Sequence, residues 1–398
     1  MKILYLCQKV PYPPNKGEKI RAYHHVTELA RRHELHLVCL SDDRKDEENV
    51  RFLRERCASV DAVHRSPGVA RWLALAAVPS ARPLTVAAFD SSGFRRLVAD
   101  RLRAVGPDLV VAYTTAMAPY AGTPGIPRVI DFVDADSEKW RAYGPVHPFP
   151  QSSLYRLEAD RLARYEGDVA SEFDASLFVS EPEAEIVRRR ARGGDLRVLP
   201  NGVDLEAFRP PPDSASARAP TIVFTGAMGY YPNADAVETF AREAFPTVRS
   251  QVPDARFVVV GRDPTPAVRR LSRLPGVEVT DTVPDVRPYL AGAALAVAPF
   301  RVARGVPNKV LEAMASALPV VGTRIAFQAL RATERDGIRI ADTPEALAAE
   351  TVALLRDPAL RREEGARARA YVEREHQWER IGAELDSILS GVVAARRR

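Results

Sequence analysis

The sequence is poor in cysteine and lacks a long hydrophobic run. Cys7, Cys39 and Cys57 lie far apart without the spacing of metal ligands, and the first two lie in strand-like runs. We expect them to be small buried residues in a reducing compartment. The longest apolar run, residues 72–79, is too short to cross a bilayer. The start of the chain is too short for a signal peptide and has no small-residue cleavage site, which favours a cytoplasmic location.

Lysine is also scarce, with 7 among 57 basic residues, so arginine carries most of the positive charge behind the net +5. Arginine suits phosphate binding, but the compact basic runs, at residues 188–192 and in the tail at 396–398, are short. Nucleic acid is therefore not an expected partner. The length of 398 residues and the hydrophobic share of 46% fit a globular protein of two or three domains.

The first half of the chain alternates short apolar runs with amphipathic segments, which predicts an open α/β sheet. A proline-rich loop ends at Gly17, before a helix expected over residues 18–32. Functional loops in such sheets follow the carboxyl ends of strands, so the Gly17 backbone could approach a phosphate or sugar closely. A proline-rich turn without a ligand explains these residues equally well. The expected strands are residues 2–7, 36–40, 60–63, 108–112, 128–133 and 175–179.

Residues 70–89 form an apolar segment that includes Trp72, Leu75 and Phe89. Two interpretations are open: a helical pair packed within the domain, or an exposed patch that meets a membrane surface. The segment lacks the dense lysine and arginine face of an interfacial helix, which favours packing.

Three aspartates, Asp131, Asp134 and Asp136, form the densest acidic cluster, at the end of the strand expected over residues 128–133. Asp134 and Asp136 superficially resemble a D-x-D metal motif. An aspartate just before a helix is also a common N-cap. We expect Asp136 to cap a helix that begins near Ser137, and Asp134 to have a functional role.

The clearest linker is the proline- and serine-rich segment 210–220. Just before it, Asn201-Gly202 indicates a turn with a positive φ angle. Two α/β domains joined in this way place a cleft between the carboxyl ends of their sheets. In the second domain, strands are expected at residues 221–225, 257–261, 277–279, 294–298 and 319–321, and helices at 234–244, 344–356 and 358–388.

One stretch of the second domain, residues 300–323, combines a loop, a helix and a buried strand. Pro307 stands at the expected first helical position, where its missing N–H loses no hydrogen bond. The free N–H groups and partial positive charge of a helix start suit a diphosphate. Glu312 lies on the same face as Asn308, placed to accept hydrogen bonds from hydroxyls such as a ribose diol. A surface pair of Lys309 and Glu312 on an ordinary amphipathic helix is an equal alternative.

These motifs together resemble one family of proteins, the retaining GT-B glycosyltransferases of the large bacterial family 4. The N-terminal PYPPNKGEKIRAYHH and the cluster IDFVDADSEKW resemble a subgroup of sugar transferases associated with exopolysaccharide and PEP-CTERM gene clusters. The resemblance spans nearly the whole chain, in the family's order. The other matching segments are VLPNGVDLEAFRP, IVFTGAMGYYPNADAV, FVVVGRDP, VPDVRPYLAGAALAVAPF and GVPNKVLEAMASALPVV.

The resemblance implies an α/β GT-B fold with two Rossmann-like domains that face each other across a cleft. Residues 1–209 would bind the acceptor, joined by a C-terminal return helix at about residues 374–398. Residues 210–373 would bind a nucleotide-sugar donor. The implied activity is transfer of a sugar, of the hexosyltransferase type, to a hydroxyl of a glycan or lipid-linked glycan. Retention at the anomeric carbon and peripheral contact with the inner face of the plasma membrane are also implied.

The same resemblance assigns roles to single residues. Glu312 would bind the donor ribose, and Asp134 would orient the acceptor or support developing positive charge; with Lys309, these are the expected catalytic residues. No metal and no cofactor are expected, because a helix start with lysine and arginine can stabilise the leaving diphosphate. The implied donor-binding residues are Gly17, Gly226, Met228, Arg262, Val283, Pro284, Arg304, Gly305, Pro307, Asn308, Val310 and Glu312.

Three positions depart from the family's pattern. Arg304 stands where the first glutamate of the E-x7-E motif belongs, Ala227 replaces the usual arginine of the first donor-domain loop, and Val133 replaces an acceptor-domain histidine. Phosphate charge would then be met by Lys309, Arg304 and Arg262. Two alternatives stay open: a nucleotide-sugar 2-epimerase of the same architecture, and a degenerate scaffold that binds a sugar nucleotide or glycan. The epimerase needs histidines around the sugar, and histidine is sparse here.

Overall fold

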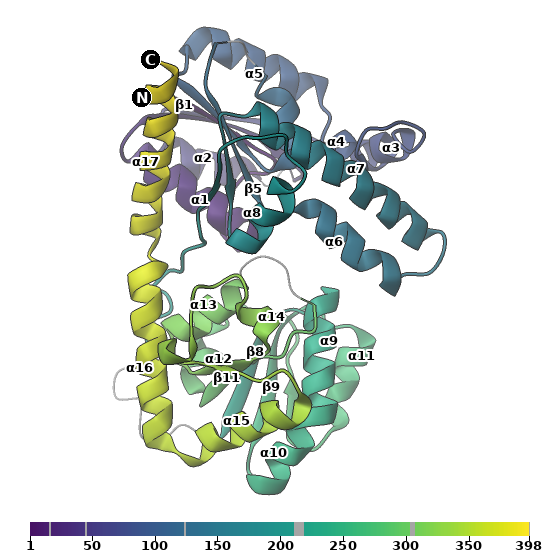
Figure 1. Cartoon of the computed structure of the whole chain (residues 1–398), viewed down its shortest axis with the longest axis vertical. Coiled ribbons are helices and arrows are strands. Elements are labelled where there is room, and N and C mark those ends of the chain that lie inside the picture. The colour runs from purple at the N-terminus through teal and green to yellow at the C-terminus, as the bar shows by residue number, and fades with distance from the viewer. Residues whose placement is uncertain (16, 44–45, 123–124, 211–218, 303–306, 398) are drawn as a thin grey trace. The chain divides into compact units, whose positions relative to one another are not determined.

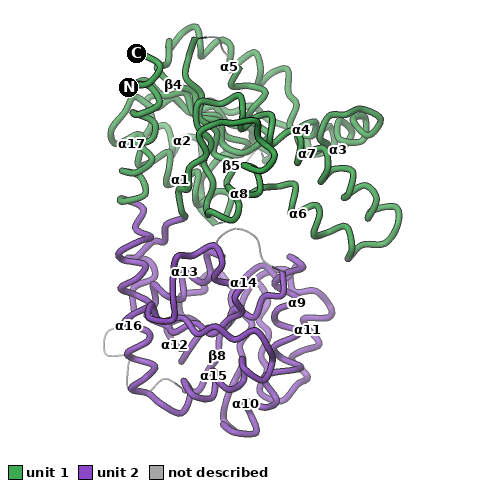
Figure 2. The backbone as a smooth tube through the Cα atoms, viewed as in Figure 1, with its two compact units in different colours: residues 1–200, 379–398 green, residues 201–378 purple. Residues whose placement is uncertain are grey.

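The chain forms two compact units, coloured separately in Figure 2: residues 1–200 with 379–398, and residues 201–378. The computed structural model describes residues 1–15, 17–43, 46–122, 125–210, 219–302 and 307–397. The units divide after Pro200 and Trp378, whereas the sequence indicated bounds at 209 and 373. Residues just after Pro200 join unit 2 because the Val203 N–H donates to the His376 carbonyl at 2.8 Å. Most of the expected linker lies outside the described residues.

Unit 1 is built on a seven-stranded sheet of order β3-β2-β1-β4-β5-β6-β7, parallel throughout. The strands are short apolar runs because helices cover both faces of such a sheet. The order reverses between β1 and β4, the point where doubly wound sheets bind ligands. The strands are β1 (Lys2–Cys7), β2 (Glu34–Ser41), β3 (Ser59–His64), β4 (Leu109–Tyr113), β5 (Arg128–Val133), β6 (Ala175–Phe178) and β7 (Leu196–Val198).

α1 begins one residue before the expected start and ends two residues before the expected end, and α6 begins near Ser137 as expected, whereas α5 was not predicted. α6 and α7 lie side by side as a hairpin (Figure 1). The helices are α1 (Gly17–Ala30), α2 (Asp46–Arg54), α3 (Pro67–Ala76), α4 (Leu84–Ala88), α5 (Ser92–Val105), α6 (Asp136–Tyr143), α7 (Gln151–Glu172) and α8 (Glu181–Arg188), with short 3-10 turns at Thr115–Tyr120 and Gly144–Val146.

The apolar segment 70–89 divides into a packed half and an exposed half. Leu84, with the rest of the α4 core residues, is buried against α3 and α7. The outer face of α3, in contrast, exposes Val69, Trp72 and Leu75, with Trp72 at 67%. The preference for packing is therefore confirmed for α4 and wrong for the outer face of α3.

Unit 2 repeats the architecture with six parallel strands in the order β10-β9-β8-β11-β12-β13, which reverses between β8 and β11. The strands are β8 (Thr221–Ala227), β9 (Arg256–Arg262), β10 (Val277–Val279), β11 (Leu295–Ala298), β12 (Val320–Gly322) and β13 (Ile338–Ile340). The helices are α9 (Tyr231–Thr239), α10 (Phe245–Gln251), α11 (Pro266–Arg270), α12 (Arg287–Gly292), α13 (Asn308–Ala315), α14 (Arg324–Phe327), α15 (Pro344–Arg356) and α16 (Pro358–Glu375), with a π-helical segment at Phe240–Ala244 and 3-10 turns at Leu271–Arg273 and Glu334–Asp336.

The long C-terminal helix expected over residues 358–388 is broken into α16 and α17 (Trp378–Arg396). At the break, the buried His376 donates from Nδ1 to the Asn201 carbonyl at 2.6 Å, which holds the backbone out of helical geometry. Residues 379–398 pack in unit 1, where Asp386 contacts His33 at 2.8 Å. The expected return helix is thus α17.

The structure explains the glycine at position 202 differently from the sequence, which indicated a turn with a positive φ angle. Its φ angle is not positive. A Cβ atom there would lie 2.5 Å from the Trp378 ring. The glycine is needed for the close approach of an indole, not for turn geometry.

Candidate functional site

The sheet of unit 2 places a glycine and a lysine together where its strand order reverses. β8 ends in Gly226 and Ala227, and α13 begins after β11. Gly226 has φ +156°, and a Cβ on it would lie 2.5 Å from Lys309 Nζ. Only glycine leaves room for the ammonium at this point. Ligands of doubly wound sheets bind at this kind of crevice.

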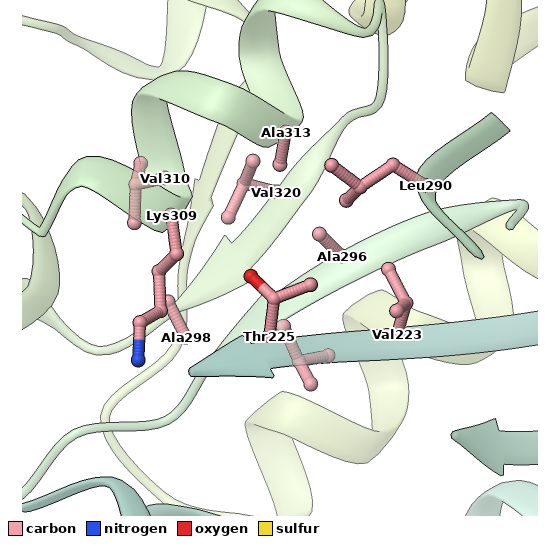
Figure 3. Close-up of a pocket in the computed structure, with 10 residues that line it drawn as sticks. Val223, Thr225, Leu290, Ala296, Ala298, Lys309, Val310, Ala313 and Val320 are labelled. Carbon is pink, nitrogen blue, oxygen red and sulfur yellow. The ribbon is translucent and has the colours of Figure 1, made fainter. Parts of the chain in front are cut away.

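Lys309 is half-buried and turned towards the sheet. Its side chain runs from α13 to the carboxyl end of β8 (Figure 3). Nζ donates to Asn233 Oδ1 at 2.6 Å and lies 4.3 Å from the centre of the Phe224 ring and 5.2 Å from that of Phe300. Burial lowers the pKa of Lys309 to about 7, and the nearby Glu312 charge opposes that shift.

Glu312 lies one turn further along α13 and is also half-buried. Burial raises its pKa to about 7, and the Lys309 charge acts in the opposite direction. Because Lys309 donates to Asn233, the alternative of a solvent-exposed Lys309–Glu312 surface pair is wrong. A carboxyl group in this state can accept hydrogen bonds from hydroxyls when ionised.

The other residues expected at the start of α13 make contacts within unit 2, some through the backbone and some through side chains. Pro307 is the N-cap, with ψ 102°, and not the first helical residue as expected. Asn308 Oδ1 accepts from Asn201 Nδ2 at 3.1 Å. Val310 is buried and its N–H donates to the Pro307 carbonyl at 2.8 Å, so its side chain belongs to the core. Arg304 and Gly305 lie outside the described residues.

The remaining donor residues expected in unit 2 fall into two groups. Met228 is buried, and its N–H donates to the Arg262 carbonyl at 2.8 Å, so these two lie together beside Gly226. Arg262 ends β9 and is half-buried. Val283 and Pro284 lie on a separate loop between β10 and α12. The structure therefore brings together Gly226, Met228, Arg262 and the start of α13.

Unit 1 presents Asp134 from a strained backbone at the end of β5. Val133 has φ +68°, a conformation that β-branched residues rarely adopt. It is held by Asp131, whose Oδ1 accepts from the Val133 N–H at 3.0 Å. Asp131 is itself fully buried and paired with Arg21, which donates from Nε at 2.8 Å. The Arg21–Asp131 pair therefore supports the backbone from which the Asp134 side chain extends.

The carboxyl group of Asp134 has strongly altered acidity. Burial raises its pKa to about 7, and the charges of Glu183 and Asp136 raise it further. Its Oδ1 atom is buried and has no hydrogen-bond partner within the described part of the chain. Gly17, the other site residue expected here, begins α1. Backbone strain and a shifted carboxyl group together are typical of functional sites.

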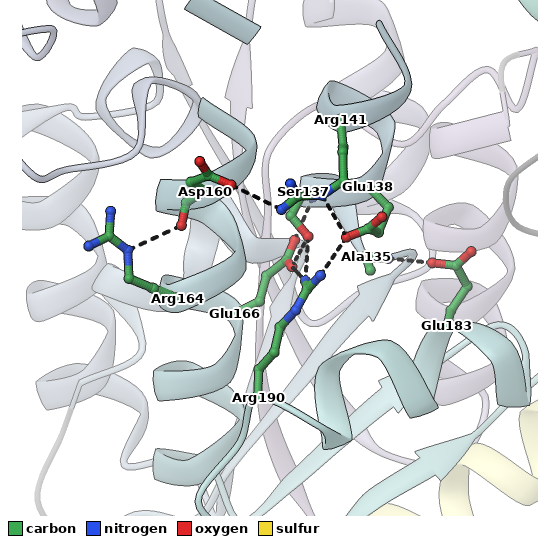
Figure 4. Close-up of polar contacts among 9 residues, drawn as sticks. All are labelled: Ala135, Ser137, Glu138, Arg141, Asp160, Arg164, Glu166, Glu183 and Arg190. Carbon is green, nitrogen blue, oxygen red and sulfur yellow. Dashed lines mark hydrogen bonds and ion pairs between the residues drawn. The ribbon is translucent and has the colours of Figure 1, made fainter. Parts of the chain in front are cut away.

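The expectation that Asp136 caps α6 is wrong. Ala135 is the N-cap, and Asp136 is the first helical residue. Two glutamates from other helices satisfy the helix start instead (Figure 4): Glu183 accepts from the Ala135 N–H at 2.8 Å, and Glu166 accepts from the Ser137 N–H at 2.9 Å. Capping from distant helices leaves no local sequence signal.

Several polar residues of the site were not expected from the sequence. Glu166 is fully buried and also accepts from Ser137 Oγ and from Arg190, and burial raises its pKa to about 8. Asn233 and the Arg21–Asp131 pair were equally unforeseen, because their partners lie far away in the chain. Within the described ranges, no three histidine, cysteine or acidic side chains are grouped to hold a metal ion.

The structure matches known glycosyltransferases over nearly its whole length. Sucrose-phosphate synthase from Thermosynechococcus elongatus has a TM-score of 0.72 at 16% identity, covering 99% of this chain and 100% of that one. Anabaena Alr3699/HepE in complex with UDP has a TM-score of 0.67 at 15% identity, covering 98% and 100%. WaaG, a glycosyltransferase involved in lipopolysaccharide biosynthesis, has 0.65 at 16%, covering 98% and 100%. These matches establish the GT-B fold.

The sequence families agree with the fold. Residues 17–207 match the family described as "Glycosyltransferase Family 4", and residues 219–357 match "Glycosyl transferases group 1". No curated protein sequence matches the chain. The protein is therefore a GT-B glycosyltransferase, with a family 4 domain in unit 1 and a group 1 domain in unit 2. None of its described helices combines the length and apolarity needed to cross a membrane.

Proposed function

We propose that the protein transfers a sugar from a nucleoside-diphosphate sugar to a hydroxyl of a glycan or lipid-linked glycan. The observation that carries this proposal is the Lys309 ammonium at the end of β8, beside Gly226 and the start of α13. A fixed cation and a helix start at a strand-order reversal suit a diphosphate. HepE, a structural neighbour, was crystallised with UDP and with UDP-glucose.

In the proposed reaction, unit 2 binds the donor and unit 1 the acceptor. Lys309 and the start of α13 stabilise the negative charge that develops on the leaving diphosphate, without a metal ion. Glu312 accepts hydrogen bonds from the ribose hydroxyls. Asp134, when ionised, orients the acceptor or supports positive charge on the sugar.

The stereochemistry and biological role are also part of the proposal. We infer retention at the anomeric carbon, with the leaving phosphate taking the acceptor proton. The resemblance of the segments at residues 11–25 and 130–140 to exopolysaccharide enzymes supports a role in the synthesis of a cell-surface polysaccharide. The structural neighbour WaaG is involved in lipopolysaccharide biosynthesis.

We further propose that the protein works in the cytoplasm, in contact with the inner face of the plasma membrane. The exposed face of α3, formed by Val69, Trp72 and Leu75, supports this location. Exposed apolar side chains grouped on one helix face suit a lipid surface, where the acceptor would be anchored. Binding of Trp72→Ser to anionic vesicles should fall, whereas Tyr231→Ser, an exposed aromatic of unit 2, should bind as the parent does. Equal binding of both variants would contradict this contact.

The donor proposal is tested by thermal stabilisation with UDP-, GDP-, TDP- and CMP-sugars. A donor at about a hundred times its dissociation constant adds roughly 2.7 kcal/mol of stability. Glu312→Ala should abolish the shift, whereas Glu363→Ala, an exposed glutamate of α16, should retain it. No shift with any nucleotide sugar, on folded protein, would support the scaffold alternative. Interconversion of the donor sugar without an acceptor would support the epimerase.

A further inference from the structure

Both polar atoms of the Asn233 side-chain amide have a partner, and one of these partners is Lys309. Asn233 lies on α9 and is 6% exposed. Its Oδ1 accepts from Lys309 Nζ at 2.6 Å, and its Nδ2 donates to the Ala227 carbonyl at 2.9 Å. An ammonium only donates and a carbonyl only accepts, so the amide has one possible orientation. The Asn233 amide therefore joins the Lys309 ammonium to Ala227, the last residue of β8.

We propose that Asn233 is a positioning residue that holds the Lys309 ammonium at the end of β8, in the place where the donor diphosphate binds. The inference rests on the proposed function, since it names the residue that prepares the donor site. Asn233 is not expected to touch the sugar or the reacting atoms; it acts through Lys309.

The chemistry of the surroundings explains why an amide fits this role. The Phe224 and Phe300 rings attract the ammonium through their faces but offer it no hydrogen-bond acceptor. A carboxylate at position 233 would supply an acceptor and would also neutralise the charge that a diphosphate needs. The neutral amide oxygen supports the charged form of the lysine and leaves its charge available to an incoming anion.

The sequence near this site increases the dependence on one lysine. Ala227 occupies the position where the family that the sequence resembles usually has an arginine, and an alanine side chain carries no charge. Arg262, on the neighbouring strand end, has a side chain 40% exposed and lies 4.0 Å from Asp263. Among these groups, only Lys309 is held by a buried partner beside Gly226.

Two substitutions at this position separate positioning from general structural support. Asn233→Ala removes the acceptor, so the Lys309 ammonium should lose its fixed place and its pKa should fall. Asn233→Asp replaces the amide by a group of the same shape and adds a negative charge, so the pKa of Lys309 should rise while its charge is neutralised. Both variants should therefore weaken diphosphate binding, but they should shift the titration of Lys309 in opposite directions.

The first measurement compares affinities for UDP, GDP and TDP with those for uridine, guanosine and thymidine. The ratio of nucleoside to diphosphate dissociation constants isolates the phosphate contribution. This ratio should fall about tenfold in both Asn233 variants, because Asn233→Ala removes one hydrogen bond to a charged group and Asn233→Asp keeps an acceptor but neutralises the charge of the ammonium. Asn49→Ala, which removes an amide hydrogen-bonded to Asp46 in unit 1, should leave the ratio unchanged.

The second measurement needs no nucleotide. Only the neutral amine reacts with acetic anhydride, so labelling against pH gives the titration of each lysine, and the chain contains only 7. The Lys309 midpoint should move to lower pH in Asn233→Ala and to higher pH in Asn233→Asp. Thermal melting of each variant shows whether it is folded before either measurement is interpreted.

The outcomes distinguish the two proposals. If the parent protein binds none of the diphosphates, the proposed function fails, whatever the labelling shows. If the parent binds one of them but both Asn233 variants keep the parent's ratio, the positioning role is overturned. An unchanged Lys309 midpoint in both folded variants would overturn it as well.

Discussion

The carboxyl ends of the two sheets carry charges of opposite sign, supported in different ways. In unit 1, the buried Asp131 is paired with the buried Arg21, and this pair supports the strained Val133 and the carboxyl group of Asp134. In unit 2, the Lys309 ammonium is supported by an amide and two aromatic rings, with no ion pair recorded for it within the described residues.

The difference shows how a site can keep a charge available. A full ion pair, as between Arg21 and Asp131, satisfies both partners and is suited to rigid support. A neutral hydrogen-bond partner does not neutralise Lys309, whose nearby acidic group is Glu312, so its charge stays available to an anion. We infer that unit 1 uses its ion pair as scaffolding, whereas unit 2 reserves its cation for a ligand.

The largest effect is expected from breaking the scaffold. Arg21→Met removes the guanidinium from the buried Asp131 carboxylate and should lower the free energy of unfolding by about 3–5 kcal/mol. The carboxylate then keeps the Val133 N–H and, at 3.4 Å, His25 Nδ1 as partners. Arg31→Met, just after the same helix and with a side chain 64% exposed, should cost less than about 1 kcal/mol. Chemical denaturation of both variants checks this difference. Similar losses in the two would show that the buried pair has no special structural role.

Removing the cation of unit 2 should act on function and not on stability. Lys309→Met should lower kcat/KM for the donor by about 10²–10³, the usual effect of losing one charge-stabilising donor. Its melting temperature should not fall, because methionine removes a partly buried charge while filling similar space. Lys2→Met, an exposed lysine, is the control. A stable Lys309→Met variant with the parental kcat/KM would contradict the role proposed for Lys309.

Asp134→Asn tests whether the unpaired carboxyl of unit 1 is used. The pKa of Asp134 is raised to about 7, so the group is neutral well below pH 7 and ionised above it. Lys309 and Glu312 also have pKa values of about 7, so the parental profile combines three groups and the test is the ratio of the parental to the variant rate of nucleoside-diphosphate release. This ratio should rise through pH 7 as Asp134 ionises and should reach about 10–100-fold at pH 8. Asp160→Asn, whose carboxyl is 61% exposed on α7, should keep the parental profile. A ratio that does not change with pH would assign the titration to another group.

Most strands could be predicted because buried parallel strands are continuous apolar runs, but the short edge strands β7 and β13 were not among the expected ones. The segments at 128–133 and 277–279 and the helix at 344–356 have the bounds that the sequence indicated. The switch-point location of Gly226 and Lys309 also follows from the order of these elements. The local sequence pattern was sufficient to predict an element wherever the residues that determine it lie within that element.

The features that escaped prediction depend on partners far away in the chain. Asn233 and Lys309 are separated by 76 positions, and Arg21 and Asp131 by 110. The break before α17 arises from a contact between His376 and Asn201. Glu166 lies in a charged helix, where a sequence pattern indicates exposure, although it is fully buried. No local signal distinguishes these residues from surface ones.

The last effect concerns Glu166, which supports the start of α6, and it is visible as a pH dependence of stability. Burial raises the pKa of Glu166 to about 8 in the folded protein, above its value of about 4 in an unfolded chain. The folded state therefore binds more protons between these two values, so the contribution of Glu166 to stability is complete below about pH 4 and is lost as the pH rises through 8.

Glu166→Gln keeps the shape of the protonated form and cannot ionise. Relative to the parent, this variant should gain stability steadily as the pH is raised from 5 to 9, as measured by denaturation at each pH. Glu363→Gln, an exposed glutamate, should run parallel to the parent. A difference between Glu166→Gln and the parent that does not change with pH would show that Glu166 is ionised throughout, held by Arg190 as a second ion pair, and the scaffold of unit 1 would then rest on two charge pairs instead of one.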